Sequence, residues 1–311
     1  MTTLDNRPAL LVVCGPTAVG KTALALELAE YFDGEILSAD SRQVYRLMDV
    51  GTAKPTSEEQ QRVRHHLIDV VWPDEEFHAA RFVSLAEEVI SGICQRNKRP
   101  FLVGGTGLYI RALTEGLLAA PSADPELRRD LHARAEREGS ASLHKELARV
   151  DPVSADRLHP NDLLRIVRAL EVYEQSGLTL SALQDKHGFR STPYRTLKIG
   201  LNLERDELYR RIGQRAEIMF EQGLMEEAEV LLQSGYDPDL KTLRTIGYRQ
   251  AFALLRQKMT REEAIDDLKR STRRYAKQQL TWFRKDKSII WLESSGDFVT
   301  IRKFIEEFYD I

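Results

Sequence analysis

Short apolar runs alternate with longer amphipathic stretches at the start of the chain. The runs have the length of strands, whereas the stretches between them repeat apolar residues every three or four positions, as helices do. Strands are expected at Leu10–Cys14, Glu35–Ser38, His66–Val71 and Pro100–Val103, and helices at Ala23–Tyr31 and Ala79–Asn97. This alternation predicts a doubly wound α/β core, in which ligands bind beyond the carboxyl ends of parallel strands.

The pattern changes after residue 115, where helical spacing continues but strand patterns almost disappear. Helices are expected at Pro125–Glu138, Ser142–Val150, Asp162–Gln175 and Thr179–His187, followed by a strand at Arg195–Leu203, long helices at Arg205–Ser234 and Met259–Phe283, and a short strand at Ile289–Leu292. We therefore predict a P-loop-type parallel sheet flanked by helices, formed by residues 1–115 and 195–311. An all-helical domain is expected to be inserted at residues 116–194, because a structureless loop of that length is uncommon.

The first predicted strand leads directly into the phosphate-binding pattern G-x-x-x-x-G-K-[ST], and a predicted helix follows it. Glycines there let backbone N–H groups and the helix N-terminus face an anion. Lys21 would meet the outer phosphates, and the Thr22 hydroxyl would ligate Mg²⁺. The pattern does not identify the phosphate compound, although ATP and GTP are the usual ligands. The predicted phosphate site consists of Gly15, Pro16, Thr17, Ala18, Val19, Gly20, Lys21 and Thr22.

Composition and charge narrow the class of protein. The chain has 311 residues, of which 30% are charged and 42% hydrophobic, as in soluble globular proteins. No apolar stretch approaches the ~20 residues of a membrane span, and Met1–Pro8 has no signal-peptide core. The two cysteines, Cys14 and Cys94, provide neither a disulfide framework nor a zinc site. A cytoplasmic protein without membrane contact is expected.

The net charge of −3 conceals a basic segment, Lys269–Lys287, which has eight Lys or Arg residues and one acidic residue. Such a concentration of positive charge on an acidic body suggests a polyanionic partner. Tyr275, Trp282 and Phe283 are interleaved with these charges and could stack on bases. The alternative is a solvated helix face.

Polar residues follow two further strands at the edge of the sheet that holds the phosphate loop. Asp40 could hold Mg²⁺ through water or act as a general base, or it could only be the N-cap of a following helix. Thr106 lies among Gly104, Gly105 and Gly107, which permit close approach of the backbone to a ligand. Two adjacent loops are thus suited to a small ligand.

Other candidates remain ambiguous from the residues alone. Lys54 could reach a phosphate or could belong to a plain polar loop. His65 and His66 would point to opposite faces of a strand, so a shared metal is not expected. Arg211 and Arg215 lie one helical turn apart and could clamp a diphosphate or pair with glutamates on a solvent face.

Eight motifs occur together in this chain: GPTAVGKT (15–22), SADSRQVY (38–45), DVGTAKP (49–55), HHLID (65–69), VGGTGLY (103–109), RIVRALEV (165–172), TIGYRQ (245–250) and YAKQQLTWFR (275–284). This set, in this order, resembles the tRNA dimethylallyltransferases over essentially the whole chain. The resemblance implies transfer of a dimethylallyl group from dimethylallyl diphosphate to the exocyclic amine of the adenine immediately 3′ of the tRNA anticodon. The product would be N6-(dimethylallyl)adenosine.

The resemblance also implies a role for each motif residue. The phosphate loop, Mg²⁺ and Arg215 would stabilise the leaving diphosphate, Thr106 would contact the oxygen of the breaking bond, and Asp40 would take the amine proton. The helical insertion would grip the anticodon stem, and the adenine would leave its stack. Contacts with tRNA are implied for Asp40, Ser41, Arg42, Gln43, Arg128, Leu164, Arg165, Ile166, Val167, Arg168, Thr245, Gly247, Tyr248, Arg249 and Gln250.

The chain departs from the family pattern at two positions. Val19 stands where many relatives have Ser, which leaves the backbone role of the loop intact, and Gln278 replaces a frequent Arg and removes one positive charge. A bacterial type is expected, because the chain has no Cys/His tail, and the protein is expected to be a monomer. Three alternatives would behave differently: a small-molecule kinase would consume ATP, an adenylate isopentenyltransferase would modify AMP, and a nucleotide-gated RNA-binding protein would tolerate Asp40→Ala.

Overall fold

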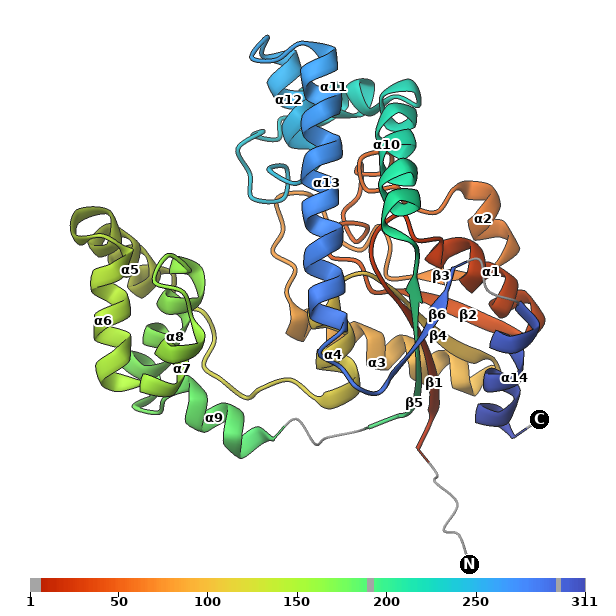
Figure 1. Ribbon diagram of the computed structural model, residues 1–311, viewed down its shortest axis with the longest axis horizontal. Helices are drawn as coiled ribbons and strands as arrows, with labels where there is room; N and C mark the ends of the chain where they lie inside the picture. The colour runs from red at the N-terminus through yellow and green to blue at the C-terminus, as the bar shows by residue number, and fades with distance from the viewer. Residues whose placement is uncertain (1–6, 189–192, 295–297, 311) are drawn as a thin grey trace, which may run out of the picture. The chain divides into compact units, whose positions relative to one another are not determined.

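In the computed structural model, which describes residues 7–188, 193–294 and 298–310, six strands form one sheet. Every pairing is parallel, and the order is β3-β2-β4-β1-β5-β6 (Figure 1). The strands are β1 (Ala9–Cys14), β2 (Gly34–Ser38), β3 (His65–His66), β4 (Arg99–Gly104), β5 (Arg195–Asn202) and β6 (Ile289–Glu293). The predicted parallel α/β sheet flanked by helices is confirmed.

Both faces of the sheet are buried, which explains why its strands are continuous apolar runs. In β1, Leu11 and Val13 face one helical layer, and Leu10 and Val12 face the other. The first layer contains α1 (Lys21–Tyr31), α10 (Arg205–Glu221) and α14 (Phe298–Tyr309), and the second contains α3 (Ala79–Gln95) and α4 (Gly107–Glu115). Because β1 lies inside the sheet, the loop that follows it is held by the core on both sides.

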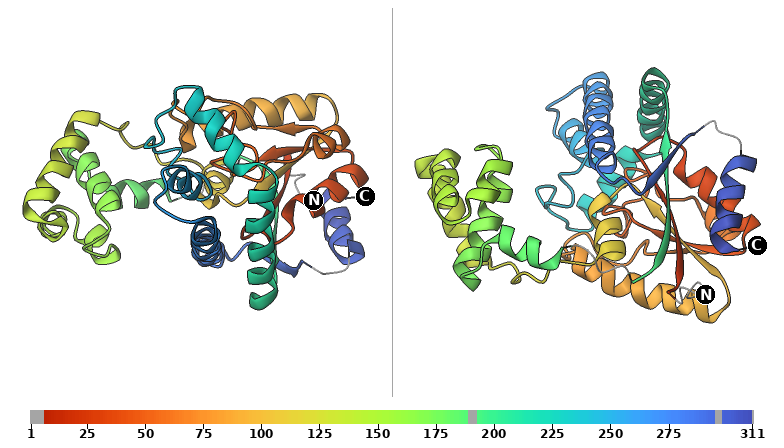
Figure 2. Two further views of the ribbon diagram at one scale, coloured as in Figure 1. Left: turned by 90° about the horizontal axis from the view of Figure 1, so that it is seen from above. Right: turned by 60° about the horizontal axis from the view of Figure 1, so that its bottom comes forward.

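A third apolar cluster supports the loops that follow β2. It joins Val44 and Met48 to α11 (Leu224–Gln233), α12 (Tyr248–Leu255) and α13 (Arg261–Phe283). The helices α10 and α13 stand side by side (Figures 1 and 2), linked by Lys269 and Glu217, 2.7 Å apart, and by Arg273 over the Tyr209 ring. These two long helices rise beyond the carboxyl ends of the strands, next to the loops.

Two predicted elements are wrong in their extent. The expected helix Arg205–Ser234 is two helices, because Gly223 adopts φ 100° as the N-cap of α11. The expected strand His66–Val71 is a strand only at His65–His66, with an isolated parallel bridge between Val71 and Tyr45, because Leu67 and Asp69 have φ values of 62° and 54°, which strands do not adopt. Helices that the sequence pattern did not reveal are α4, α7 (Pro152–Arg157), α12 and α14, and α2 (Ser57–Arg62) is a short further one.

Residues Glu115–Ser191 form a compact unit separate from the unit of Met1–Thr114 and Thr192–Ile311. It contains α5 (Pro125–Glu138), α6 (Ser140–Val150), α7, α8 (Leu163–Ser176) and α9 (Leu180–His187), around a core that includes Leu131, Leu143 and Leu170. The sequence predicted an insertion at 116–194, of which 189–192 lie outside the described residues, as do residues 1–6 of the polar N-terminal segment. Across the described residues, no helix is long and apolar enough to span a membrane.

Candidate active site

A cavity of about 430 Å³ lies where the loops after β1, β2 and β4 meet α10 and α13. It brings together many of the residues that the sequence analysis selected from distant motifs. Those that line it are Thr17, Lys21, Thr22, Asp40, Ser41, Arg42, Gln43, Arg215 and Thr245. The carboxyl edge of the sheet therefore carries a single concave site built by separate parts of the chain.

The phosphate loop is curled by three positive φ values, 142° at Gly15, 64° at Ala18 and 103° at Gly20. A Cβ atom at Gly15 would lie 2.8 Å from the carbonyl oxygen of Leu201, so β5 leaves no room for a side chain there. Gly20 is the N-cap of α1, and no side chain caps this helix. The partial positive charge of the helix N-terminus is thus available to an anion.

Two cations at the cavity are largely withdrawn from water. Burial lowers the pKa of Lys21 to about 8, although Asp40 opposes the shift, and the Lys21 Nζ atom donates to Pro16 O at 2.7 Å. Burial also lowers the pKa of Arg215, whose Nη1 atom lies 3.4 Å from the Thr17 hydroxyl. A bound anion would compensate both desolvated charges.

Asp40 caps a turn and not the start of a helix, because the next helix begins only at Ser57. Its Oδ1 atom accepts the N–H groups of Arg42 at 2.8 Å and Gln43 at 3.3 Å, so the carboxylate caps a turn. It also lines the cavity and acts electrostatically on Lys21 and Arg215. A turn cap that faces two buried cations is a fixed and accessible carboxylate.

Thr106 joins the loop after β4 to the loop after β2. Its hydroxyl accepts the Ser41 N–H at 3.0 Å, and its own N–H donates to Ala39 O at 3.1 Å. The Gly-rich segment makes this approach possible, since a Cβ atom at Gly104 would lie 2.2 Å from Ala39 O. Thr106 therefore lies directly beside the turn that Asp40 caps.

Two residues of α13 at this site were missed as site residues, because they were read as part of the basic segment. Gln279 is buried, accepts the Thr17 N–H at 2.8 Å and donates to Gly105 O at 2.9 Å. Tyr275 lies one turn earlier and bonds to Thr106 and Gln279, and burial followed by the charge of Asp40 raises its pKa to about 12. Their spacing of four places both on one helix face, which is the signal that could have separated them from the charged face.

The basic segment consequently has two different faces. Of the three aromatic residues expected to stack on bases, Phe283 is buried in the sheet core and Tyr275 lines the cavity. Trp282 is 39% exposed. Only Trp282 among these three thus remains available at the surface.

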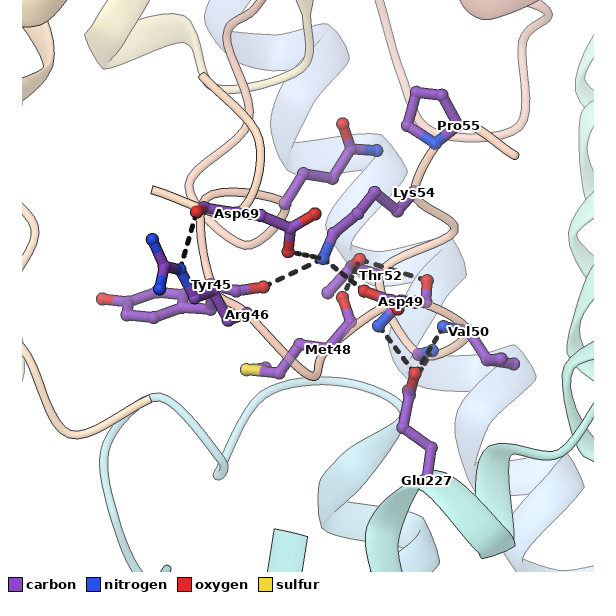
Figure 3. Close-up of polar contacts among 12 residues, drawn as sticks. Tyr45, Arg46, Met48, Asp49, Val50, Thr52, Lys54, Pro55, Asp69 and Glu227 are labelled. Atoms are coloured by element: carbon purple, nitrogen blue, oxygen red, sulfur yellow. Dashed lines mark hydrogen bonds and ion pairs between the residues drawn. The ribbon is translucent and has the colours of Figure 1, made fainter. Parts of the chain in front are cut away.

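Lys54 holds its own loop together and is not among the residues that line the cavity. Its side chain is 4% exposed, and Nζ contacts Tyr45 O at 3.0 Å, Asp69 at 2.6 Å and Asp49 (Figure 3). Arg211 pairs with Glu207 at 2.9 Å, so the expected two-arginine clamp is reduced to Arg215 at the cavity.

The adjacent histidines have separate partners. His66 Nε2 lies 2.6 Å from the Glu35 carboxylate, and His65 Nδ1 lies 2.8 Å from Val63 O. Within the part of the chain that the structure describes, no group of three or more His, Cys, Asp or Glu side chains could hold a metal ion.

Several side chains implied in tRNA contact are instead buried. Tyr248 and Gln250 lie in the core, where Tyr248 donates to Glu227 and Gln250 bonds to Gly247 N and Asp267. Ile166 and Val167 lie in the core of the helical unit. Their side chains cannot present a surface to RNA. Arg249, whose Nη2 donates to Ser271 Oγ at 2.9 Å, stays partly exposed.

The arginines of the helical unit are engaged with acids. Arg128 and Arg168 both bond to the fully buried Glu171 carboxylate. Arg165 pairs with Asp162 at 2.5 Å but is largely exposed. Leu164, at the start of α8, is 74% exposed, so its side chain lies at the surface.

Family models match almost the whole chain. One described as "IPP transferase" covers residues 43–286, and one described as "Isopentenyl transferase" covers residues 8–72. The chain is 53% identical over 305 residues to tRNA dimethylallyltransferase 2 of Geotalea uraniireducens, with 98% of each chain covered. It is 52% identical to tRNA dimethylallyltransferase of Geobacter metallireducens, with 98% of this chain and 99% of the relative covered.

Solved structures show the same likeness. The full-length tRNA isopentenylpyrophosphate transferase from Bacillus halodurans matches with a TM-score of 0.73 at 41% identity, over 98% of this chain and 97% of that one. A eukaryotic dimethylallyltransferase acting on tRNA matches with a TM-score of 0.78 at 28% identity, over 92% of this chain and 74% of that one. The likeness extends over nearly the whole chain in both sequence and fold.

Proposed function

The chain belongs to the tRNA dimethylallyltransferase family, and we propose that dimethylallyl diphosphate is its donor and the exocyclic amine of the adenine 3′ of the anticodon its acceptor. It is a transferase that acts on tRNA. The cavity in which the phosphate loop, Asp40 and Arg215 meet is the observation that supports this chemistry. The full-length matches disfavour a small-molecule kinase and a protein that only binds RNA.

The diphosphate would lie in the curled phosphate loop. Lys21, Arg215 and the loop amides would stabilise the negative charge that develops on it as the bond to the prenyl carbon breaks. Both side chains are desolvated before the donor arrives, so little solvent has to be rearranged during the reaction. The loop thus serves a leaving group rather than a transferred phosphoryl group.

Mg²⁺ is the proposed cofactor, with the Thr22 hydroxyl as a ligand. Thr22 and Asp40 both line the cavity and offer oxygen donors. A hard cation that takes its remaining ligands from phosphate and water suits such a sparse donor set. When bound, Mg²⁺ would neutralise charge on the diphosphate.

In the proposed transfer, the adenine nitrogen forms a bond to the allylic carbon, the carbon–oxygen bond to diphosphate breaks, and Asp40 accepts the amine proton. Thr106 would contact the oxygen of the breaking bond. Water reaching the carbon would hydrolyse the donor, so the apolar lining matters. Ile36, Val103, Ile212 and Met219 contribute to that lining.

The remaining parts of the proposal concern the partner. The helical unit would grip the anticodon stem of tRNA, and the adenine would be flipped out of its stack to enter the cavity. We propose that the protein acts as a monomer in the cytoplasm.

The test is an incubation of the protein with dimethylallyl diphosphate, Mg²⁺ and unmodified tRNA that has an adenine just 3′ of its anticodon. Mass spectrometry of the digested RNA should show one added five-carbon group on that adenine. Parallel reactions with AMP as acceptor, and with ATP in place of the donor, test the adenylate isopentenyltransferase and kinase alternatives. Modification of AMP alone, or consumption of ATP without an RNA adduct, would overturn the proposal.

A further inference from the structure

One carboxylate, that of Glu227 on α11, binds the backbone of the loop Asp49–Gly51 (Figure 3). Glu227 Oε2 accepts the N–H groups of Asp49 at 2.7 Å and Val50 at 2.8 Å, and Oε1 accepts the N–H of Gly51 at 2.9 Å. Three consecutive backbone donors that converge on one ionised group form strong, charge-assisted bonds. A glutamate of α11 that only faced solvent would have no such backbone partners.

Tyr248 completes the anchor from a second direction. Its hydroxyl donates to Glu227 Oε1, and its ring lies against Gly51, where an added Cβ atom would come within 2.5 Å of the ring. Burial, followed by the Glu227 charge, raises the pKa of Tyr248, so its hydroxyl stays protonated and remains a donor. The motifs at 49–55 and 245–250 are therefore bound to each other.

The anchored loop in turn supports the turn that carries Asp40. Gln43 Nε2 donates to Ala53 O at 3.1 Å, and Lys54 Nζ donates to Tyr45 O at 3.0 Å. The Ser38 hydroxyl donates to Oε1 of the same Gln43 amide at 2.9 Å. The segment between the anchor and these contacts also lines the cavity, through Gly51, Thr52, Ala53 and Pro55.

We propose that Glu227 is a positioning residue for the transfer step, because it fixes the loop 49–54 that supports the Asp40–Tyr45 turn. It acts through backbone donors and does not itself line the cavity. The inference rests on the function proposed above. Replacement of Glu227 should slow the transfer to the adenine acceptor and should not change the affinity for the donor, since none of these contacts involves the phosphate loop.

The experiment compares Glu227→Gln with Glu229→Gln, an exposed glutamate on the same helix. Glutamine keeps the length of the side chain but has only one acceptor oxygen, and its amide would face backbone donors. We expect the single-turnover transfer rate of Glu227→Gln to fall about ten- to a hundredfold, because small misplacements of reacting groups cause rate losses of about this size. The donor Kd should stay close to that of Glu229→Gln, whereas the melting temperature should fall, because charge-assisted bonds to the loop are lost.

Tyr248→Phe is the second variant, because it removes one donor to Glu227 and leaves the ring on Gly51. Its transfer rate should fall by a smaller factor, again with an unchanged donor Kd. If Glu227→Gln does not fold, the transfer rate and donor Kd of Tyr248→Phe test the positioning role instead. Equal rates in Glu227→Gln and Glu229→Gln, or a loss of donor affinity that parallels the loss of rate, would refute the positioning role. Absence of transfer by the unaltered protein would refute the proposed function instead.

Discussion

Gln279 accepts the backbone N–H of Thr17 at 2.8 Å, although the two residues are 262 positions apart. The same side chain donates to Gly105 O, so one amide ties the phosphate loop to the Gly-rich loop after β4. Gln279 belongs to α13, which also carries most of the basic segment. A single helix therefore connects the basic segment with the phosphate loop.

Gln279→Glu should weaken donor binding. Glutamate cannot donate to Gly105 O, and it places a negative charge beside the diphosphate site. We expect the Kd for dimethylallyl diphosphate to rise about tenfold or more, corresponding to one lost buried hydrogen bond and added repulsion. Gln278→Glu is the matched control, because it changes the same charge at the exposed neighbouring position. Equal donor affinity in the two variants would contradict the connection.

Lys21→Ala and Arg215→Ala should each weaken donor binding and slow turnover, since both remove a charge that faces the diphosphate site. The affinity for tRNA should stay near that of the unaltered protein. Arg210→Ala serves as the control, because Arg210 is exposed and pairs with Glu207 one turn away. Isothermal titration with the donor and filter binding with tRNA separate the effects. A parallel loss of tRNA binding would show that the two cations have another role.

Asp40→Asn should abolish most of the transfer rate and leave both binding affinities in place. The asparagine oxygen can still accept the N–H of Arg42, so the turn is preserved, but the amide cannot accept a proton. Loss of a general base lowers rates by about 10²- to 10⁴-fold. Single-turnover kinetics at saturating donor and tRNA measure this. A variant that retained its full rate would exclude Asp40 as the base.

The sequence alone allowed the fold class and the location of the site to be predicted, because those depend on local patterns. The apolar run before Gly15 and the glycines around Thr106 are signals that lie within a few adjacent residues. The roles of Lys54 and Tyr248 could not be predicted in this way. Their partners, Asp69 and Glu227, are brought to them only by tertiary packing.

The same limit applies to the predicted RNA contacts, some of whose side chains are buried. A motif records which residues a family shares, and it does not distinguish a residue that touches RNA from one that shapes the surface. Ile166 and Val167 are buried next to the exposed Leu164 and Arg165 on the same short segment. Helical periodicity would separate these pairs, because residues on the buried stripe recur every three to four positions.

Arg128→Ala should destabilise the helical unit, whatever its effect on tRNA. Arg128 bonds to the fully buried Glu171, and its loss leaves that carboxylate with fewer partners. We expect a cost of about 1–3 kcal/mol, less than for a fully buried pair because the Arg128 side chain is 41% exposed. Arg129→Ala is the control at an exposed neighbour. Thermal unfolding of the two variants should differ, and identical melting curves would contradict a structural role for Arg128.

The donor affinity should depend on pH through Lys21. Burial lowers its pKa to about 8, so in the free protein Lys21 is charged below this pH and becomes neutral above it. The proposed diphosphate donor would bind the charged form, and its Kd should therefore rise as the pH increases from about 7 to 9, with proton uptake on binding. In Lys21→Arg the side chain stays charged throughout this range, and the pH dependence should largely disappear. Calorimetric titrations in buffers of different ionisation enthalpy measure both the affinity and the proton uptake. A Kd that rises equally in Lys21→Arg would assign the pH dependence to another group.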